Sequence, residues 1–184
     1  FTAANFELTE LGAVRAPIRV TSACENSTIQ RTYTVTAGSD QVQVNAKIDF
    51  HEKHRALKFT FPMTEETVTA QIPFGTVTRQ GDTGEEPCQK WIASDNLCVA
   101  NDCKYGYEVD KQRMIITLLK APMNPDPKSD RGDHYFTYAI YPHAGNWKQA
   151  ETLVRGLEMN NPAVAVDVKA DAKGDDAKSF INVI

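Results

Sequence analysis

The sequence predicts a mainly β protein, a large antiparallel β-sandwich with one covering helix near residues 147–159. Short runs rich in β-branched and aromatic residues recur along the 184 residues, and turn-forming residues separate them. A single segment has the period of a helix. About a dozen short strands with one helix favour a sandwich, because a βαβ fold would alternate strands with helices.

The clearest strand pattern lies in Gln41–Phe50, where apolar and polar residues alternate without interruption. Ile29–Thr36 precedes it with a similar alternation, and the short glycine-containing segment Ala37–Asp40 joins the two. This arrangement predicts an antiparallel hairpin. The residues expected to face inward on its second strand are Val42, Val44, Ala46, Ile48 and Phe50.

Further short apolar runs predict the remaining strands. Proline removes a ladder donor, so Pro17 in the first of these runs indicates an edge strand or a bulge. The expected strands are Val14–Ala23, Leu57–Phe61, Val68–Ile72, Thr76–Arg79, Gln89–Ala93, Leu97–Ala100, Tyr105–Val109, Met114–Leu119, Ala163–Val168 and Phe180–Ile184, with a charged loop at Lys169–Lys178.

Asp133–Trp147 contains the strand expected at the centre of the sheet. Neither face of Phe136–Tyr141 is clearly polar, which predicts a strand covered on both sides and ended by Pro142. The helix is expected to follow from Trp147 to Met159, with Asn146 as its N-cap. It should cover the sheet or pack on a neighbouring domain through an apolar stripe of Ala150, Leu153, Val154 and Leu157.

Composition limits the classes of function. A net charge of −4 gives no electrostatic case for nucleic acid or an anionic membrane, and no apolar run approaches the ~20 residues that span a bilayer. The four cysteines form no C-x-x-C pair, so free thiols in a reducing cytoplasm are expected. The chain starts at Phe1 and stops within an apolar run, which suggests one β-sandwich domain, 1–184, cut from a longer polypeptide.

Catalytic motifs are not recognisable in the chain. His51 and His54 are three residues apart between two strands, where a solvated turn is expected rather than a metal site. Adjacent carboxylates on an extended chain point to opposite faces, so they rarely cooperate as acid and base. Arg131–Asp133 matches a short adhesion tripeptide, and an adhesion role would require it to form an exposed loop tip with a solvated Asp133.

Asn101–Tyr107 has the composition of a binding loop. It brings an amide, a carboxylate, an amine and two phenols together around Gly106, between two apolar strands. These groups suit hydrogen bonds to sugar hydroxyls and stacking on a sugar ring. The alternative is a tight turn whose Asn and Asp side chains bind their own backbone.

Several segments in fixed order resemble α-mannosidases of glycoside hydrolase family 38, in particular the branch containing the cytosolic mammalian enzyme and its bacterial relatives. The similarity runs from about Leu11 to Pro162. The segments that carry it are Gly12–Ala16, Asn26–Ile29, Ala37–Asp40, Asp49–Glu52 with Leu57–Lys58, Ile72–Gly75, Asn101–Gly106, Asp130–Gly132 and Phe136–His143.

This resemblance implies a supersandwich similar to galactose mutarotase, located in the C-terminal region of a retaining, zinc-dependent enzyme. In the family, an N-terminal domain holds the zinc and the two catalytic aspartates, so no catalytic residue or metal ligand is assigned here. The implied partners are that N-terminal catalytic domain and a mannose-containing oligosaccharide, with a possible homo-oligomer in the full-length form.

The resemblance also implies a share of the active-site rim for the loop at Asn101–Gly106. Asp102 and Lys104 are the substrate-side candidates, and Lys104 stands where several relatives carry arginine. Lysine is a point charge and cannot make the bidentate contacts of arginine. The alternative function is an autonomous carbohydrate-binding or structural β-sandwich without a catalytic role.

Overall fold

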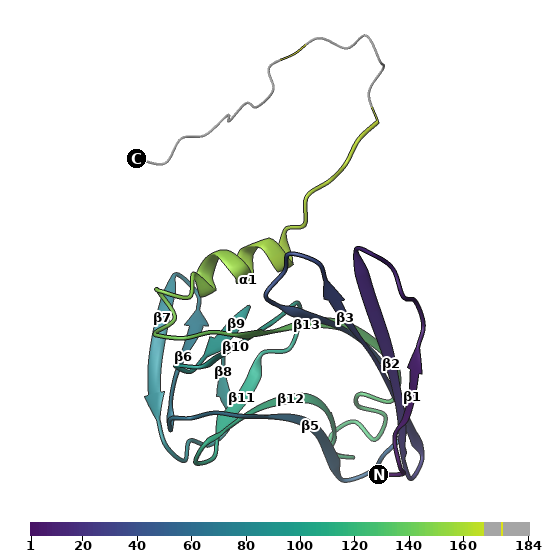
Figure 1. Cartoon of the computed structure of the whole chain (residues 1–184). Helices are drawn as coiled ribbons and strands as arrows, with labels where there is room; N and C mark the ends of the chain where they lie inside the picture. Colours follow the sequence, from purple (N-terminus) through teal and green to yellow (C-terminus); the bar gives the residue numbers. More distant parts are fainter. Residues whose placement is uncertain (168–173, 175–184) are drawn as a thin grey trace.

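Two antiparallel β-sheets of unequal width face each other in the computed structural model, which describes residues 1–167 and 174 (Figure 1). The large sheet has nine strands in the order β1 (Asn5–Leu8), β2 (Arg15–Cys24), β3 (Ser27–Thr36), β4 (Val42–Phe50), β13 (Gly132–Pro142), β10 (Leu97–Asn101), β9 (Trp91–Ala93), β6 (Thr67–Ile72) and β7 (Gly75–Gln80). The small sheet has four, in the order β5 (Arg55–Pro62), β12 (Arg113–Ala121), β11 (Gly106–Val109) and β8 (Glu86–Pro87). The predicted β-sandwich is therefore confirmed.

The predicted hairpin is formed by β3 and β4. Its register runs from Thr28 opposite Asp49 to Val35 opposite Val42, without a shift. Val44 and Ile48 are completely buried, as their period-two spacing predicts. They belong to the main core, which fills the space between the two sheets.

The predicted central strand is β13, which pairs with β4 on one side and β10 on the other. Phe136 and Tyr138 face the small sheet and are buried. Pro142 is the last residue of the strand, as expected. The prediction that both faces are covered is correct only in part. Tyr135 is 66% exposed, because the helix on the outer face packs over β9 and β10 instead.

The edge of the large sheet differs from the prediction. β2 is the second strand, because β1 pairs with it from Leu8 opposite Ile18 to Asn5 opposite Thr21. Pro17 lies one residue beyond this pairing, so its missing N–H removes no bond to β1, and the pairing of β2 with β3 has no bulge. All four residues of β1 are exposed, which explains why no alternating pattern indicated this strand.

The predicted helix begins later than expected, since α1, the one helix among the described residues, spans Thr152–Asn160. Asn146 and Gln149 do form the predicted reciprocal cap. Asn146 Oδ1 accepts from the Gln149 N–H at 3.2 Å, and Gln149 Oε1 accepts from the Asn146 N–H at 3.0 Å. This cap closes only a turn, because Glu151 has a left-handed backbone conformation with φ of 52° and separates the turn from the helix.

The face that α1 presents to the sheet is also different. Leu153, Val154 and Leu157 of the expected stripe are 44–48% exposed, whereas Thr152 and Gly156 are buried. The phase of the helix is set by a close approach to Trp91, since a Cβ atom on Gly156 would lie 2.6 Å from Trp91 Cδ1. Beneath α1 a second small core gathers Trp91, Ala93, Cys98 and Ala100.

The cysteines agree with the sequence prediction, and the C-terminal segment differs from it over 163–167. All four thiols are free, and burial raises the pKa of Cys88 and Cys98 to about 12. No strand forms over 163–167, and the rest of the C-terminal predictions, Lys169–Lys178 and Phe180–Ile184, lie outside the described residues apart from Gly174. None of the helices in the described part is both long and apolar enough to cross a membrane.

Replacement of Gly156 with alanine tests the contact that orients α1. Alanine favours a helix over glycine by about 1 kcal/mol, but overpacking a filled core costs about 1–3 kcal/mol. We expect a net loss of free energy of unfolding in urea titrations. The control is Leu157→Ala on the exposed face, which should change stability by less than about 1 kcal/mol. A more stable Gly156→Ala protein would contradict the packing described here.

Candidate functional site

The candidate loop, Asn101–Tyr107, leads from β10 of the large sheet to β11 of the small sheet, and therefore lies at one end of the sandwich. Asn101 is buried, and its Oδ1 accepts a hydrogen bond from the Lys104 N–H at 2.6 Å. Its carbonyl oxygen accepts from Asn160 Nδ2 of α1 at 3.2 Å. The tight-turn interpretation is thus correct for Asn101, which serves the backbone of the loop.

Asp102 continues the pairing of β10 with β13 beyond the last strand residue. Its Oδ2 accepts from the Thr137 N–H at 2.8 Å, and its own N–H donates to the Thr137 carbonyl at 3.1 Å. The residue is exposed, and its carboxylate is also a hydrogen-bond partner of the Cys103 thiol, whose pKa burial and then this carboxylate raise to about 11. The carboxylate therefore positions the loop and lies at the surface of the molecule.

Lys104 points toward the core and not away from the loop. Its Nζ lies 4.9 Å from the centre of the Phe136 ring, a cation–π distance. Within the described chain it makes no ion pair with a carboxylate. The neighbouring Tyr105 side chain is 57% exposed. The loop thus brings an ammonium without a carboxylate partner, an exposed carboxylate and an exposed phenol into one segment.

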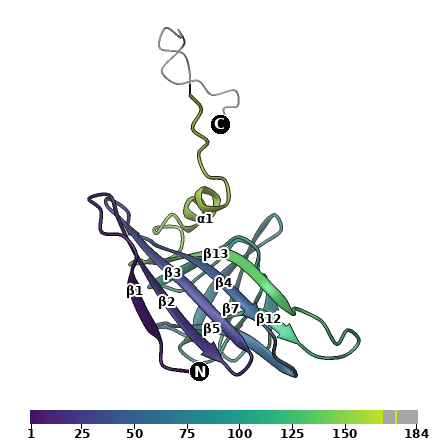
Figure 2. The same ribbon diagram turned by 90° about the vertical axis from the view of Figure 1, so that its right-hand side faces the viewer.

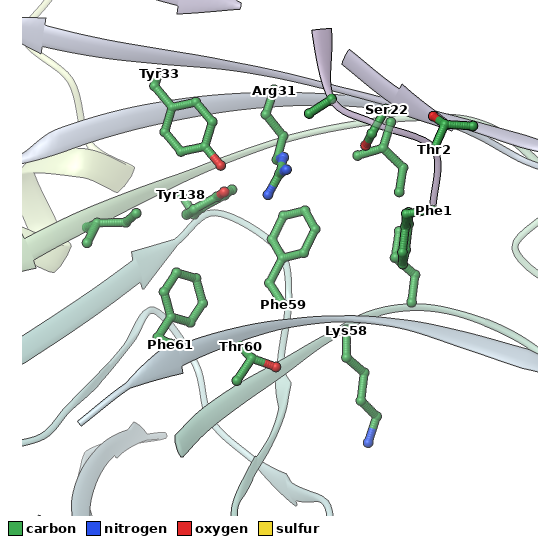
Figure 3. A pocket seen from close by; sticks show the side chains of 14 residues that line it. Phe1, Thr2, Ser22, Arg31, Tyr33, Lys58, Phe59, Thr60, Phe61 and Tyr138 are labelled. Atoms are coloured by element: carbon green, nitrogen blue, oxygen red, sulfur yellow. The ribbon is translucent and has the colours of Figure 1, made fainter. Parts of the chain in front are cut away.

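A cavity of about 410 Å³ opens between the two sheets at the opposite edge of the small sheet (Figure 3). Strand β5 contributes the lower wall through Leu57, Phe59 and Phe61. Strand β3 contributes Arg31 and Tyr33 to the upper wall, and the other lining residues are Phe1, Thr2, Ala4, Ser22, Ile29, Lys58, Thr60, Tyr138 and Ile140. The volume is in the range of small-molecule sites.

Arg31 is the unpaired charge of this cavity. Its guanidinium carbon lies 5.1 Å from the centre of the Phe59 ring and 5.6 Å from that of Tyr33, and Figure 3 shows it pointing between them. Nε is buried without a hydrogen-bond partner, and among the described residues no carboxylate forms an ion pair with the side chain. The side chain is only partly buried, and its hydrogen-bond partner in the cavity is the neutral phenol of Tyr138, so the positive charge is not neutralised and the position favours an anionic group.

Tyr138 and Lys58 determine which charges the cavity presents. Burial, with Tyr33 adding to the effect, raises the pKa of the Tyr138 phenol, which therefore stays neutral beside Arg31. Lys58 points away in Figure 3, and its Nζ lies 2.7 Å from Glu108. None of the lining residues is acidic. Arg31 is then the one lining cation left for a ligand.

The position of Arg31 in the sequence is unusual for a strand with one face on a core. Arg31 occupies the inward phase of β3, between Ile29 and Tyr33, where an apolar residue is expected. The register confirms this phase, since Arg31 lies opposite the buried Val20. A charge on the apolar phase of a strand thus marked the cavity.

The turn at 51–54 differs from its prediction in one residue. Glu52 is only 3% exposed, so the turn is not fully solvated. Its Oε1 accepts from Ser27 Oγ at 2.7 Å and from the Asn26 N–H at 3.2 Å, which fixes the β2–β3 turn. Arg131–Asp133 does not form a loop tip. Asp133 is exposed, but it belongs to β13, where its backbone lies opposite Asp49 of β4.

The family is decided by comparison with known domains. The model of the glycosyl hydrolases family 38 C-terminal domain matches residues 2–128, more than half of the chain. The chain belongs to this family. Most of the segments that resemble glycoside hydrolase family 38 in the sequence lie within the matched residues.

Individual relatives agree with this assignment. Human alpha-mannosidase 2C1 is 28% identical over 169 residues, which is 84% of this chain and 16% of the relative. Alpha-mannosidase G of Dictyostelium discoideum is 30% identical over 150 residues, 74% of this chain and 14% of the relative. The chain therefore spans about a sixth of the length of the curated relatives it matches.

A solved structure shows the same fold. An alpha-mannosidase from Enterococcus faecalis V583 superposes with a TM-score of 0.74 at 16% identity, over 86% of this chain and 24% of that one. A second family 38 protein from Enterococcus faecalis gives a TM-score of 0.73 at 18% identity.

Asp102→Ala tests the structural half of the role of this carboxylate. The exposed end of β10 would lose the acceptor for the Thr137 N–H, and a typical hydrogen bond contributes about 0.5–1.5 kcal/mol. We expect a corresponding fall in the urea midpoint. Asp102→Asn keeps an oxygen in the same place and should lose less. Equal stability of the alanine variant and the parent protein would contradict the role of Asp102 as an extension of β10.

Proposed function

We propose that this chain is the C-terminal β-sandwich domain, residues 1–184, of a longer α-mannosidase that hydrolyses terminal α-mannosidic bonds in glycans or oligosaccharides. The observation that carries the proposal is the family match over residues 2–128. Relatives that are named alpha-mannosidases and are several times longer support it. In this proposal the domain buttresses the catalytic domain and lines one side of the substrate cleft.

The catalytic apparatus is proposed to lie outside this chain, in the N-terminal domain of the same polypeptide. In the family, zinc and two aspartates perform a retaining hydrolysis there. The described residues do not fit a zinc site, because no group of three or more His, Cys, Asp and Glu side chains converges in that part of the chain. We assign no nucleophile, acid/base or metal ligand to this domain.

Asp102 and Lys104 are proposed to face the substrate from the rim of the cleft. The exposed carboxylate of Asp102 suits a hydrogen bond from a sugar hydroxyl, and the exposed Tyr105 beside it offers an aromatic face. Lys104 has no carboxylate partner in the described chain, so its ammonium is free to leave Phe136 for a ligand oxygen. Lysine would donate there as a point charge.

A cytoplasmic location is proposed for the enzyme, in line with the resemblance to the cytosolic branch. Four free thiols, of which two are buried, are suited to a reducing compartment. A net charge of −4 gives no electrostatic reason to add nucleic acid or an anionic membrane to the proposed partners. A homo-oligomer of the full-length enzyme remains part of the proposal.

Hydrolysis of an aryl α-mannoside tests this function. The full-length polypeptide should release the aryl group, and the 184-residue chain by itself should not, because the catalytic residues are proposed to lie in the N-terminal domain. An enzyme-like rate from the 184-residue chain would contradict the proposal. An inactive full-length polypeptide that binds mannose would favour the alternative, an autonomous carbohydrate-binding module.

The kinetic effect of Lys104→Ala tests the substrate-side role in the full-length enzyme. Loss of one charge-assisted hydrogen bond should raise KM for an oligosaccharide by about tenfold. Lys148→Ala is the matched control, because Lys148 Nζ also lies over an aromatic ring, Trp147 at 5.4 Å, but on the outer face of the sheet. A KM that is equal in both variants would show that Lys104 contributes to packing alone.

Titration calorimetry of the 184-residue chain with mannose and mannobiose tests the alternative, an autonomous carbohydrate-binding module. That alternative requires a measurable affinity of the isolated chain for these sugars.

A further inference from the structure

The inner face of the large sheet extends past the edge of the small sheet. β5 is the edge strand of the small sheet, and within the described residues it pairs only with β12. Figure 2 shows β1, β2 and β3 side by side at the front of the molecule, beyond this edge. One row of β5 backbone groups therefore lacks strand partners, a ready template for another strand.

Register identifies the side chains on this uncovered face. Val20 lies opposite Arg31 on β3 and Phe6 on β1, while Ile18 lies opposite Tyr33, so all of them share the inner face. Yet Phe6 is 70% exposed and Ile18 is 44% exposed. The same face also exposes Leu8 and Val35. Contiguous apolar side chains on an inner face are unusual for a finished sandwich and indicate a missing layer.

The dimensions fit one further strand or more. Neighbouring strands lie about 4.8 Å apart, and facing sheets about 10 Å apart. A strand next to β5 would therefore lie across from Ile18, Val20 and Tyr33. The cavity of about 410 Å³ lies between β5 and Tyr33, and a second recess of about 370 Å³, which Ile18 and Val20 line, adjoins it through Ala4, Arg31 and Tyr33.

Arg31 specifies the chemistry of the occupant. Its guanidinium points into the cavity, where it meets the neutral phenol of Tyr138 and two aromatic rings but no acidic residue. A strand that covered this site with apolar residues alone would leave the charge buried and unpaired, which costs several kcal/mol. A carboxylate side chain would instead accept the planar fork of donors that arginine offers.

We propose that an extended segment of the same enzyme's polypeptide, outside these 184 residues, pairs with β5 as an additional strand and places an Asp or Glu side chain on Arg31. The inference rests on the proposed function, in which this chain is one part of a longer α-mannosidase. The chain covers 16% of the human relative and 24% of the Enterococcus faecalis structure, so most of each related polypeptide lies outside the aligned region.

A second copy of this chain is a poorer occupant. Two copies joined edge to edge through β5 would each present Arg55–Pro62 to the other's cavity. This segment contains no aspartate or glutamate, so it would leave both copies of Arg31 without a carboxylate.

Hydrogen exchange of β5 in the full-length polypeptide tests the inference. An edge strand protects alternate amides only, whereas a strand paired on both sides protects nearly all. We expect the amides of Arg55–Pro62 to exchange as slowly as those of β4, which is paired on both sides. Fast exchange of every second β5 amide would overturn the inference.

Two substitutions then test the carboxylate. Arg31→Gln should speed exchange across β5 by at least about tenfold, the effect of losing one charged hydrogen bond, and Arg31→Lys should restore part of the protection. Arg19→Gln is the matched control, since Arg19 lies on the opposite face of the adjacent strand and pairs with Glu7 at 3.2 Å. Equal effects of Arg31→Gln and Arg19→Gln would overturn the carboxylate contact.

Mannosidase activity of the same preparation keeps this test separate from that of the proposed function. An active enzyme with rapidly exchanging alternate β5 amides refutes the added strand and leaves the function intact. An inactive polypeptide with fully protected β5 amides refutes the function and leaves the added strand intact.

Discussion

The contact between Phe59 of β5 and the aromatic side chains of β13 decides how the two sheets are placed. The Phe59 ring centre lies 5.6 Å from that of Tyr138 and 6.5 Å from that of Phe136, and Phe61 adds an edge contact to Tyr138 at 6.1 Å. Such pairs contribute about 0.5–1.5 kcal/mol each beyond the area they bury. They join the edge strand of the small sheet to the central strand of the large one.

This placement explains the two features that carry chemistry. Because β5 lies across from β13, the small sheet stops short of β1 and β2, and the cavity with Arg31 opens at that edge. On the other side of the same aromatic cluster, Lys104 rests on Phe136. The candidate loop is also held from outside, because Asn160 of α1 donates to the Asn101 carbonyl. Helix, loop and aromatic core thus form one connected support.

The sequence predicted those parts of the fold in which burial alternates simply. The hairpin β3–β4 and the core residues of β13 follow directly from period-two spacing, because each has one face on the same core. β1 escaped prediction since all its residues are exposed. The helix start could not be predicted, because the left-handed conformation of Glu151 competes with a good local cap at Asn146.

The candidate site was predictable to a similar degree. Composition indicated the loop at Asn101–Tyr107, but the structural role of Asp102 depends on its hydrogen bond to Thr137, which is 35 residues away in sequence. The cavity depends on the relative width of two sheets, which strand patterns do not encode. Arg31 was nevertheless recognisable in the sequence, because it is a charged residue at a position of β3 where the alternation predicts an apolar one.

An experimental structure of the full-length polypeptide tests the central claim most directly, namely that the unequal sheets of this domain are completed by the rest of the enzyme. The account predicts a strand hydrogen-bonded to the free edge of β5, covering Phe6 and Ile18, with a carboxylate in ion-pair contact with Arg31. A full-length structure in which the β5 edge and Arg31 still face solvent would contradict it.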